Sequence, residues 1–429
     1  MAQTLDLPKQ NRMVDALPGE WAAFGWSFLY FFALLTGYYV MRPVRDAMGA
    51  VGNLRWYFTA TFVCMLLLTP VYGAVVARFP RRVFLPLVYV FFIACLGGFY
   101  FAFDSDAAWR GPVFFVWVAV FNLFAVTVFW SYMADVFESD QSRRLFGWIA
   151  AGGTIGGFLG PTITTVFVER IGIANLLLVT AALLALCLVC IVALGPHARA
   201  REARRGGASG ESAMGGSMLA GLRLIRDTPL LQAMCVLMVF GVGVGTLLYN
   251  EQAAIARAGF PDAAARTAFY ARIDLAINVL TIVVQVGVTR WLLVRYGVGP
   301  TILLPAFAVL IGFSLLAASP LPLLVAIVQV ATRAGEFSLG KPARDSIYTR
   351  VDREIRYKAK GVIDTAVYRG GDVTFVWLHH GLTQGLGLGS SGVFGVGILV
   401  ALGMLGGVLW LIRLLPAGDA EIARGAPPP

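Results

Sequence analysis

Apolar runs about as long as a bilayer is thick recur along almost the whole chain, and they limit what it can fold into. The hydrocarbon core of a bilayer is about 30 Å thick, so a helix that crosses it needs about 20 mostly apolar residues. The first run, Trp21–Met41, has 21 residues and no charged side chain. The other runs are Trp56–Ala77, Val83–Phe103, Gly111–Ala134, Leu145–Val168, Ile171–Leu194, Leu230–Tyr249, Ile273–Leu293, Val298–Ala318, Leu321–Leu339, Gly361–Leu382 and Val393–Leu415. The sequence therefore predicts an all-α membrane protein with twelve transmembrane helices.

The composition supports this prediction. Of the 429 residues 58% are hydrophobic and 14% are charged, whereas about 25% are charged in typical soluble domains. The net charge of +10 comes mainly from arginines at the ends of apolar runs, which is typical of loops that fix membrane orientation and argues against a nucleic-acid partner. The five cysteines, including Cys187 and Cys190, lie inside apolar runs and are expected to pack there, so we expect no metal site and no cofactor.

The runs divide into two sets of six, and this division predicts the domain organisation. A polar stretch rich in Arg, Gly and Ser separates the sets and is typical of a flexible tether. The predicted units are a cytoplasmic tail (1–20), a six-helix bundle (21–194), a cytoplasmic basic linker (195–228), a second six-helix bundle (229–415) and a cytoplasmic tail (416–429).

Lysines and arginines are distributed unequally between the two sides of the predicted membrane. With the N-terminus inside, the inner segments hold 24 of them and the outer segments hold eight. An excess of positive charge marks the cytoplasmic side, so we expect a multi-pass protein of the bacterial inner membrane with both termini in the cytoplasm. The first twenty residues contain no apolar core of a signal peptide, so we expect no cleavage there.

Weak internal repeats relate the two sets of runs. Paired basic residues follow a glycine in the turns at Gly73–Arg82 and Gly287–Gly297, and the fifth run contains the small-residue pattern of Gly152–Pro161. Small residues four apart allow helices to approach closely. These repeats resemble those of the major facilitator superfamily. The first turn is similar to the GxxxDxxGRR motif of that superfamily at Gly73, Arg81 and Arg82, but it has Ala77 in place of the acidic residue and Pro80 in place of a glycine.

Three groups of charged residues lie within or beside the predicted spans, where charge is costly and usually functional. At the end of the first span, Arg42 and Asp46 are spaced to pair, which would leave Arg45 free for an anion. Pro43 can kink the helix there. The alternative interpretation is a polar cap at the end of this helix.

The second group lies at the tenth span. Arg333 and Glu336 are three residues apart, so they form either a structural ion pair within the helix or part of a solute or ion site. Lys341 and Arg344 follow and are candidate solute-binding residues together with Arg333.

The third group lies in the eleventh span. Asp364, Tyr368 and Asp372 recur every four residues and so share one helix face, with Arg369 beside them. We expect this face to line the solute path, with pairing between helices as the alternative. Asp274 in the eighth span is a weaker candidate of the same kind. Glu336, Asp364, Asp372 and Asp274 are the candidate coupling or gating residues.

Two further runs resemble a narrower branch of the superfamily. The stretch RPVRDAMG after Met41, together with Ala343–Asp364 and Tyr368–Asp372, is similar to the bacterial ATP/ADP translocase-type nucleotide transporters. This resemblance implies twelve helices and exchange of ATP for ADP, or uptake of nucleotides. It also implies that Arg42, Arg45, Lys341 and Arg344 bind the solute. The chain has only four lysines, so arginine supplies most of the positive charge, and arginine grips phosphate as a bidentate fork.

The favoured hypothesis is an alternating-access carrier of an anionic metabolite, in particular a nucleotide, that works as a monomer in the lipid bilayer. The alternative is a proton-coupled carrier of a drug, sugar or organic acid. A membrane enzyme is disfavoured, because the longest predicted outer loop contains only Glu251 and Asp262 as carboxylates.

Overall fold

The computed structural model describes residues 17, 19–78, 81–103, 105, 107–204, 218–348 and 362–415, and the regular structure among them is helical throughout. The first bundle contains α1 (Trp21–Val51), α2 (Leu54–Arg78), α3 (Arg81–Phe103), α4 (Arg110–Val136) and α5 (Ser139–Arg204). After α6 (Met218–Asp227) come α7 (Pro229–Gly259), α8 (Ala263–Val284), η1 (Gln285–Thr289), α9 (Arg290–Tyr296), α10 (Val298–Ala318), α11 (Pro322–Gly335), η2 (Glu336–Gly340), α12 (Lys341–Tyr348), η3 (Ile363–Val367), α14 (Tyr368–His380), η4 (Gly381–Gly385) and α15 (Ser390–Leu414).

The predicted apolar runs all fall on these helices. In the described part of the chain, ten continuous helical stretches are long and apolar enough to cross a membrane. One of them, α5, holds the fifth and sixth runs on either side of Gly172, which has φ +79° and breaks the helix there. The eleventh run falls on η3, α14 and η4. The prediction of an all-α fold of membrane-spanning helices is therefore confirmed, while the division into two sets of six stays a prediction.

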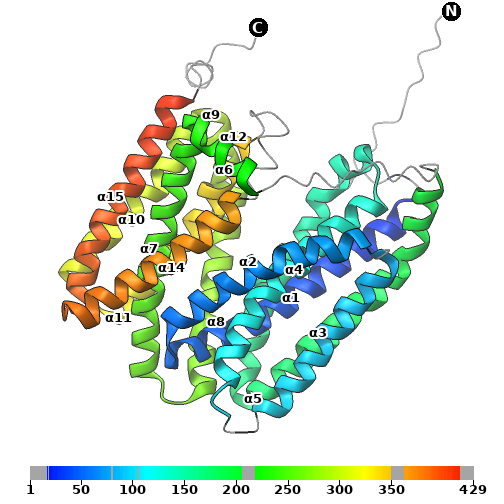
Figure 1. The fold of residues 1–429 in the computed structure, drawn as a ribbon, viewed down its shortest axis with the longest axis horizontal. Coiled ribbons are helices and arrows are strands. Elements are labelled where there is room, and N and C mark those ends of the chain that lie inside the picture. The colour runs from blue at the N-terminus through cyan, green and yellow to red at the C-terminus, as the bar shows by residue number, and fades with distance from the viewer. Residues whose placement is uncertain are drawn as a thin grey trace, which may run out of the picture.

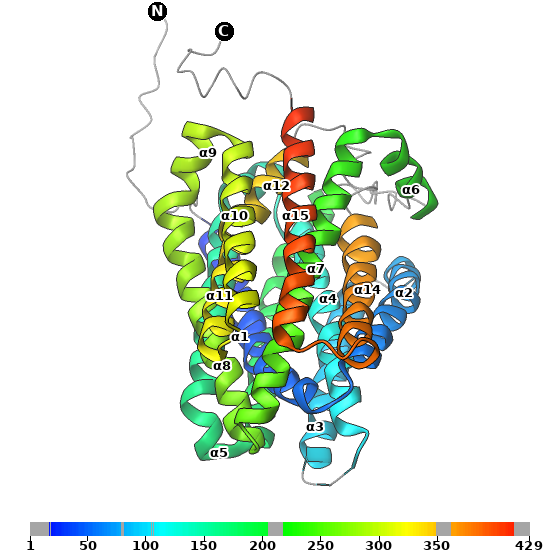
Figure 2. The same ribbon diagram turned by 90° about the vertical axis from the view of Figure 1, so that its left-hand side faces the viewer.

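Two apolar cores divide the spans in the same way. One core joins α1, α3, α4 and α5 around Tyr30 and Phe129, and the other joins α7, α10, α11 and α15 around Phe313 and Phe394. The N-terminal end of α1 and the C-terminal end of α15 lie at the same end of the molecule, at the top of Figure 1, and the α7–α8 connection lies at the other end. Figure 2 shows the same arrangement from the side, with most of the long helices upright.

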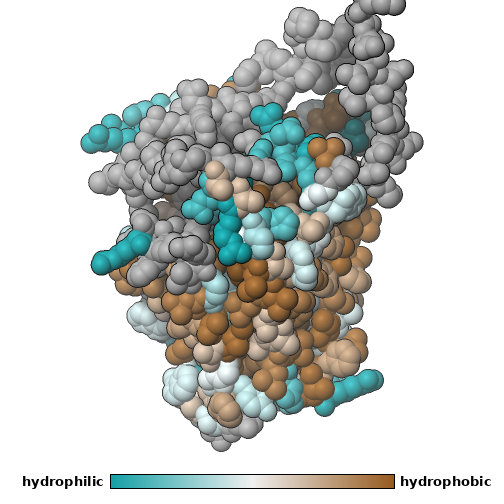
Figure 3. Space-filling model, turned by 90° about the vertical axis from the view of Figure 1, so that its right-hand side faces the viewer, coloured by the Kyte–Doolittle hydropathy of each residue, from teal (hydrophilic) through white to brown (hydrophobic). Residues whose placement is uncertain are grey.

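Hydrophobic side chains cover the outside of the helices. In Figure 3 they fill the middle of the face shown, with polar residues toward its upper and lower ends. Large apolar side chains such as Val286 and Phe101 are 80% and 73% exposed, which would be costly in water and is favourable against lipid tails. This surface agrees with a protein that spans a bilayer.

Glycines in α5 allow it to pack tightly against α1. A Cβ atom at Gly156 would lie 2.6 Å from the carbonyl oxygen of Phe32, and one at Gly160 would lie 2.6 Å from Cβ of Tyr39. No larger residue fits at these distances without a shift of the backbone. The close helix approach predicted from the small residues of the fifth run is confirmed.

The first helix is longer than its apolar run predicts. The run was expected to end at Met41, but α1 continues through Pro43 to Val51 as one α-helix. Arg42, Arg45 and Asp46 therefore lie inside α1, and the alternative of a polar cap at the helix end is wrong.

The two bundles contact each other at one end, which we call the contact end. An apolar cluster there joins α1, α2, α4, α7, α8 and α14, and it contains Ala47, Ala50, Leu54, Phe115, Tyr249, Ala253, Ala256, Tyr270 and Val376. Most of these residues lie near the C-terminal ends of α1 and α7 and the N-terminal ends of α2 and α8. This is the end of the molecule opposite to the one at which α1 begins. The contact end therefore closes the space between the bundles on one side.

Candidate solute site

A cavity in the second bundle brings together several of the predicted charged residues. Its wall comes from α7, α10, α11, η2, α12, α14 and α15. It is lined by Leu237, Met238, Gly241, Val242, Val244, Gly245, Thr246, Pro305, Val309, Thr332, Arg333, Glu336, Arg344, Tyr368, Asp372 and Met404. Most of the wall is apolar, and a few polar groups converge on it, which is the usual make-up of a small-molecule site.

Arg333 is the cation in this cavity that has no partner. It lies in the last turn of α11, and its guanidinium reaches toward Gly245 of α7, where a Cβ atom would lie 3.8 Å from Nη2. Its Nε is buried without a hydrogen-bond acceptor, and no described carboxylate lies within ion-pairing distance of it. A buried donor without an acceptor is costly, so this group is a candidate contact for a solute.

Glu336 pairs with Arg344 and not with Arg333. Nη1 of Arg344 donates to Oε2 of Glu336 at 3.0 Å, and Nη2 donates to Oε1 as well, so the pair is bidentate. The Arg333–Glu336 ion pair, one of the two alternatives left open by the spacing, does not form. The π-helical turn η2 begins at Glu336 and separates it from Arg344 along the chain. Gly340 leaves room for the pair, because a Cβ there would lie 2.6 Å from Oε2 of Glu336.

Asp372 supplies the third polar group of the cavity. It is buried, accepts a 3.0 Å hydrogen bond from Oγ1 of Thr246 in α7, and pairs with Nη1 of Arg369 at 3.2 Å. Tyr368 also lines the cavity, and its ring lies 5.4 Å from the Arg369 guanidinium. The helix face predicted from Tyr368 to Asp372 thus points into the cavity.

Asp364 and Lys341 differ from these residues. The side chain of Asp364 lies outside the described residues. Its backbone belongs to the π-helical η3, so the four-residue spacing to Tyr368 does not mark one α-helical face. Lys341 is exposed and is not part of the cavity wall.

Residues 349–361, which carry much of the nucleotide-transporter resemblance, are also outside the described residues. So are the side chains of Gly73, Ala77, Arg81 and Arg82, and all of Pro80.

The charged residues of α1 form a separate network at the contact end. Nη2 of Arg45 lies 2.6 Å from Oδ1 of Asp46. The spacing predicts that Arg45 is free for an anion, and this prediction is wrong, because Arg45 is paired. Arg42 lies 3.9 Å from Asp46, as its spacing predicts, and 3.5 Å from Oδ1 of Asp274 in α8. The Tyr249 hydroxyl of α7 donates to Oδ1 of Asp46 at 2.9 Å. This network joins the two bundles.

Two residues of these sites were missed from the sequence. Thr246 and Tyr249 both lie on α7, in a run judged only by its apolar length. They are three residues apart and precede Asn250, so a polar stripe on one face of that run was the available signal.

A second polar contact between the bundles lies beside this network. Arg55 of α2 hydrogen bonds to Nε2 of His380 in α14, and Nε1 of Trp377 donates to Oγ1 of Thr59 at 3.1 Å. His379 in turn lies 2.9 Å from Oε1 of Glu251 in α7. The contact end is therefore held by polar groups on two sides of its apolar cluster.

The charges along this path nearly cancel. The described charged residues of the cavity and the network are five arginines (Arg42, Arg45, Arg333, Arg344 and Arg369) and four carboxylates (Asp46, Asp274, Glu336 and Asp372). One positive charge is left over, and the geometry places it on Arg333.

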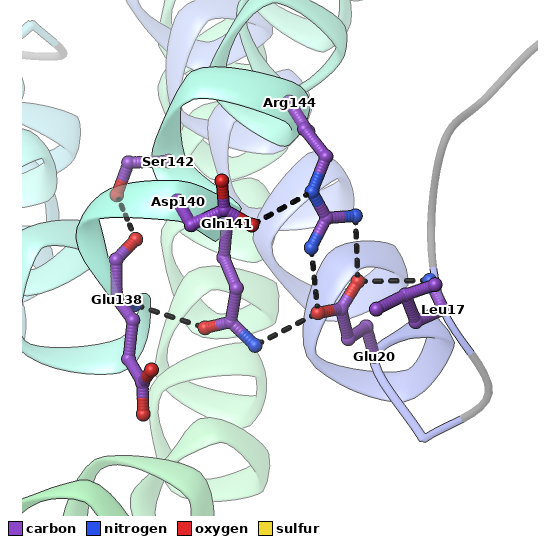
Figure 4. Close-up of polar contacts among 7 residues, drawn as sticks. All are labelled: Leu17, Glu20, Glu138, Asp140, Gln141, Ser142 and Arg144. Carbon is purple, nitrogen blue, oxygen red and sulfur yellow. Dashed lines mark hydrogen bonds and ion pairs between the residues drawn. The ribbon is translucent and has the colours of Figure 1, made fainter. Parts of the chain in front are cut away.

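A further polar cluster lies away from the cavity, where α1 begins. Glu20 accepts hydrogen bonds from Arg144 at 3.0 Å, from Gln141 at 2.9 Å and from the backbone of Leu17 at 2.8 Å, as Figure 4 shows. Burial by itself would raise the pKa of Glu20, but the hydrogen bonds from Arg144, Leu17 and Gln141 outweigh it and hold the pKa below its ordinary value. The cluster ties the start of α1 to the start of α5.

Two membrane bundles that meet at one end, with a polar cavity inside one of them, define a polytopic secondary transporter. The model of the Major Facilitator Superfamily matches residues 22–371, so the chain belongs to that superfamily. No curated protein sequence is significantly similar to it.

Solved transporter structures share the fold. A D-xylose-proton symporter has a TM-score of 0.62 at 14% identity, over 90% of this chain and 97% of that one. A POT family transporter in complex with 5-aminolevulinic acid has a TM-score of 0.62 at 13% identity, over 93% of this chain and 96% of that one. The nucleoside transporter NupG has a TM-score of 0.58 at 14% identity, over 92% of this chain and 99% of that one. At these identities the similarity establishes the fold alone.

Proposed function

We propose that this chain is an alternating-access carrier of an anionic metabolite. The observation that carries the proposal is Arg333, an unpartnered guanidinium on the wall of a cavity inside a membrane bundle. An unpaired charge inside a membrane protein costs about 2.5–3.5 kcal/mol or more, and binding an anion offsets this cost. Glu336 and Asp372 in the same cavity are candidate sites for coupling to protons.

The direction of access follows from the charge bias of the sequence. With 24 basic residues on the side of the termini and eight on the other, the contact end faces away from the cytoplasm. The bundles are packed together there by Tyr249, Asp46, Arg42 and Asp274. This packing supports an inward-facing state, in which solute reaches the cavity from the cytoplasm of a bacterial cell. Opening the contact end while closing the other end would complete a transport cycle.

The resemblance of the first and tenth-to-eleventh helix runs to ATP/ADP translocase-type transporters favours a nucleotide as the metabolite. ATP/ADP exchange is therefore the first reaction to test. A proton-coupled carrier of a drug, sugar or organic acid is the competing outcome.

The experiment is uptake of labelled ATP, ADP and phosphate into proteoliposomes, with and without nucleotide preloaded inside. The Arg333→Gln variant removes the proposed anion ligand. The matched control is Arg226→Gln, because Arg226 is an exposed arginine on α6 that pairs with its neighbour Asp227. Uptake that Arg333→Gln abolishes and Arg226→Gln preserves supports the anion carrier. Nucleotide uptake that does not depend on preloading excludes obligatory exchange, and an anion flux indifferent to Arg333 excludes the proposed site.

A further inference from the structure

The charge balance of the cavity limits how much negative charge a bound solute can carry. In and beside the cavity, Arg333, Arg344 and Arg369 face Glu336 and Asp372, which leaves one positive charge. The separate network at the contact end, with two arginines and two carboxylates, is neutral as a whole. Lys341 and Asp364, the two predicted site residues outside this balance, have opposite charges and leave it unchanged. In a medium of low dielectric constant, charge left uncompensated is strongly unfavourable.

The rest of the cavity wall is suited to an apolar body. Leu237, Met238 and Val242 of α7 face the same space as Pro305 and Val309 of α10 and Met404 of α15. Thr332 and Tyr368 also line the cavity, and their hydroxyls are donors that an anionic group can use. The hydroxyl proton of Thr246 is already donated to Asp372. The enclosed volume of the cavity is about 70 Å³, which is below the usual range for small-molecule sites, so in this conformation it fits the charged group of a solute and little more.

We infer that the solute is a small organic monoanion, with one carboxylate or singly charged phosphate ester bound by Arg333 and an apolar body against α7 and α10. This inference rests on the proposed anion carrier and narrows its substrate class away from ATP and ADP. Each of these nucleotides carries several negative charges, which would outnumber the single cation left uncompensated. Discrimination then depends on the number of negative charges on the solute, and Asp372 and Glu336 keep the net charge of the cavity at one while both carboxylates are ionised.

The test is binding to the purified full-length protein in nanodiscs, measured by calorimetry and by thermal stabilisation. The probes form matched sets: benzoate, phenylacetate and octanoate as monoanions with apolar bodies, benzamide as a neutral analogue, phthalate as a dianion, and ADP and ATP. We expect at least one carboxylate to bind more tightly than the neutral analogue, the dianion and both nucleotides. Losing hydrogen bonds to a charged group should weaken that binding by about ten- to a hundredfold in Arg333→Gln. Arg333→Lys should retain part of it, because it keeps the charge but loses the fork.

A change of charge number gives a second, independent test. Asp372→Asn and Glu336→Gln each raise the charge of the path by one, so each should shift the binding preference from benzoate toward phthalate. Two variants are used so that one still gives a result if the other fails to fold. Unchanged selectivity in the variants that fold would overturn the inference, as would tighter binding of ADP or ATP than of every monoanion, or no binding of any monoanion. If nucleotides bind through Arg333, the inference fails while the proposed function stands. If no anion of any charge binds, both fail.

Discussion

Arg42 of α1 and Asp274 of α8 lie 3.5 Å apart, Nη1 to Oδ1, and form an ion pair between the two bundles. Both side chains are largely removed from solvent, with exposed fractions of 14% and 5%. The second oxygen of Asp274 is buried and has no hydrogen-bond partner, so Arg42 is the main group that offsets its charge. A state that is open at the contact end has to separate this pair, which makes the pair a candidate lock of that end.

Asp274→Asn should therefore weaken the closure of the contact end. The amide keeps the shape of the side chain but loses the charge that attracts Arg42, and removing one partner of a buried pair costs about 3–5 kcal/mol. Spin labels at Arg110, where α4 begins, and at Asp262, before α8, should report a larger or broader distance by electron paramagnetic resonance. Asp274→Glu keeps the charge and serves as the control. The same distance distribution in Asp274→Asn and wild type would show that the pair does not lock this end.

Tyr249→Phe should destabilise the protein, whereas Tyr270→Phe should not. Both rings lie in the apolar cluster of the contact end, but only the Tyr249 hydroxyl bonds to Asp46, while the buried hydroxyl of Tyr270 has no partner. A hydrogen bond to a charged group contributes about 1.5–3 kcal/mol. Thermal unfolding in detergent should show a lower Tm for Tyr249→Phe and an unchanged or higher Tm for Tyr270→Phe. Equal effects of the two substitutions would contradict a specific role for the bond to Asp46.

Gly156→Ala should disturb the packing of α1 on α5. The added methyl would lie 2.6 Å from the carbonyl oxygen of Phe32, and overpacking of this kind costs about 1–3 kcal/mol. Gly147→Ala is the matched control on the same helix, because nothing lies within 4 Å of a Cβ atom at that position. Tm and the fraction of monodisperse protein after purification measure the effect. A loss as large in Gly147→Ala would point to helix flexibility and not to packing.

Run length and composition predicted the helices well, because a membrane leaves little choice for twenty apolar residues. They did not predict where α1 ends. The run stops at the first charge, Arg42, but the helix continues, since Arg42 and Arg45 are neutralised by Asp46 within the helix and by Asp274 from another bundle. A partner so distant in the sequence leaves no local signal.

The pairing of charges was predicted less well than their presence. Spacing left two interpretations of Arg333 and Glu336, an ion pair within the helix or part of a solute site. In the structure Glu336 pairs with Arg344 across the π-helical turn at Glu336–Gly340, and Arg333 has no partner among the described residues. A π-helical turn depends on packing against neighbouring helices and has no clear sequence pattern. The residue that most defines the cavity was therefore identified as charged and buried, but not as the unpartnered one.

Stability in acid should depend on Glu20, at the start of α1. Its pKa is lower in the folded protein than in the unfolded chain, so the folded state gains stability above the ordinary pKa of a glutamate, and this gain is lost as the pH falls through the lowered value. The pair with Arg144 lies near the surface, so we expect it to contribute less than about 1 kcal/mol.

Thermal unfolding between neutral pH and about pH 3 checks this, because an ordinary glutamate titrates near 4.3 and the lowered pKa of folded Glu20 lies below that. Glu20→Gln should have a lower Tm than wild type at neutral pH, and the difference should shrink on acidification because wild-type Glu20 then becomes neutral too. Asp140→Asn is the control, because Asp140 also lies near Arg144 but its side chain is 84% exposed, so its pair should be worth little at any pH. A Tm difference between Glu20→Gln and wild type that stayed constant across this range would mean that the hydrogen bonds of Glu20, and not its charge, hold α1 to α5.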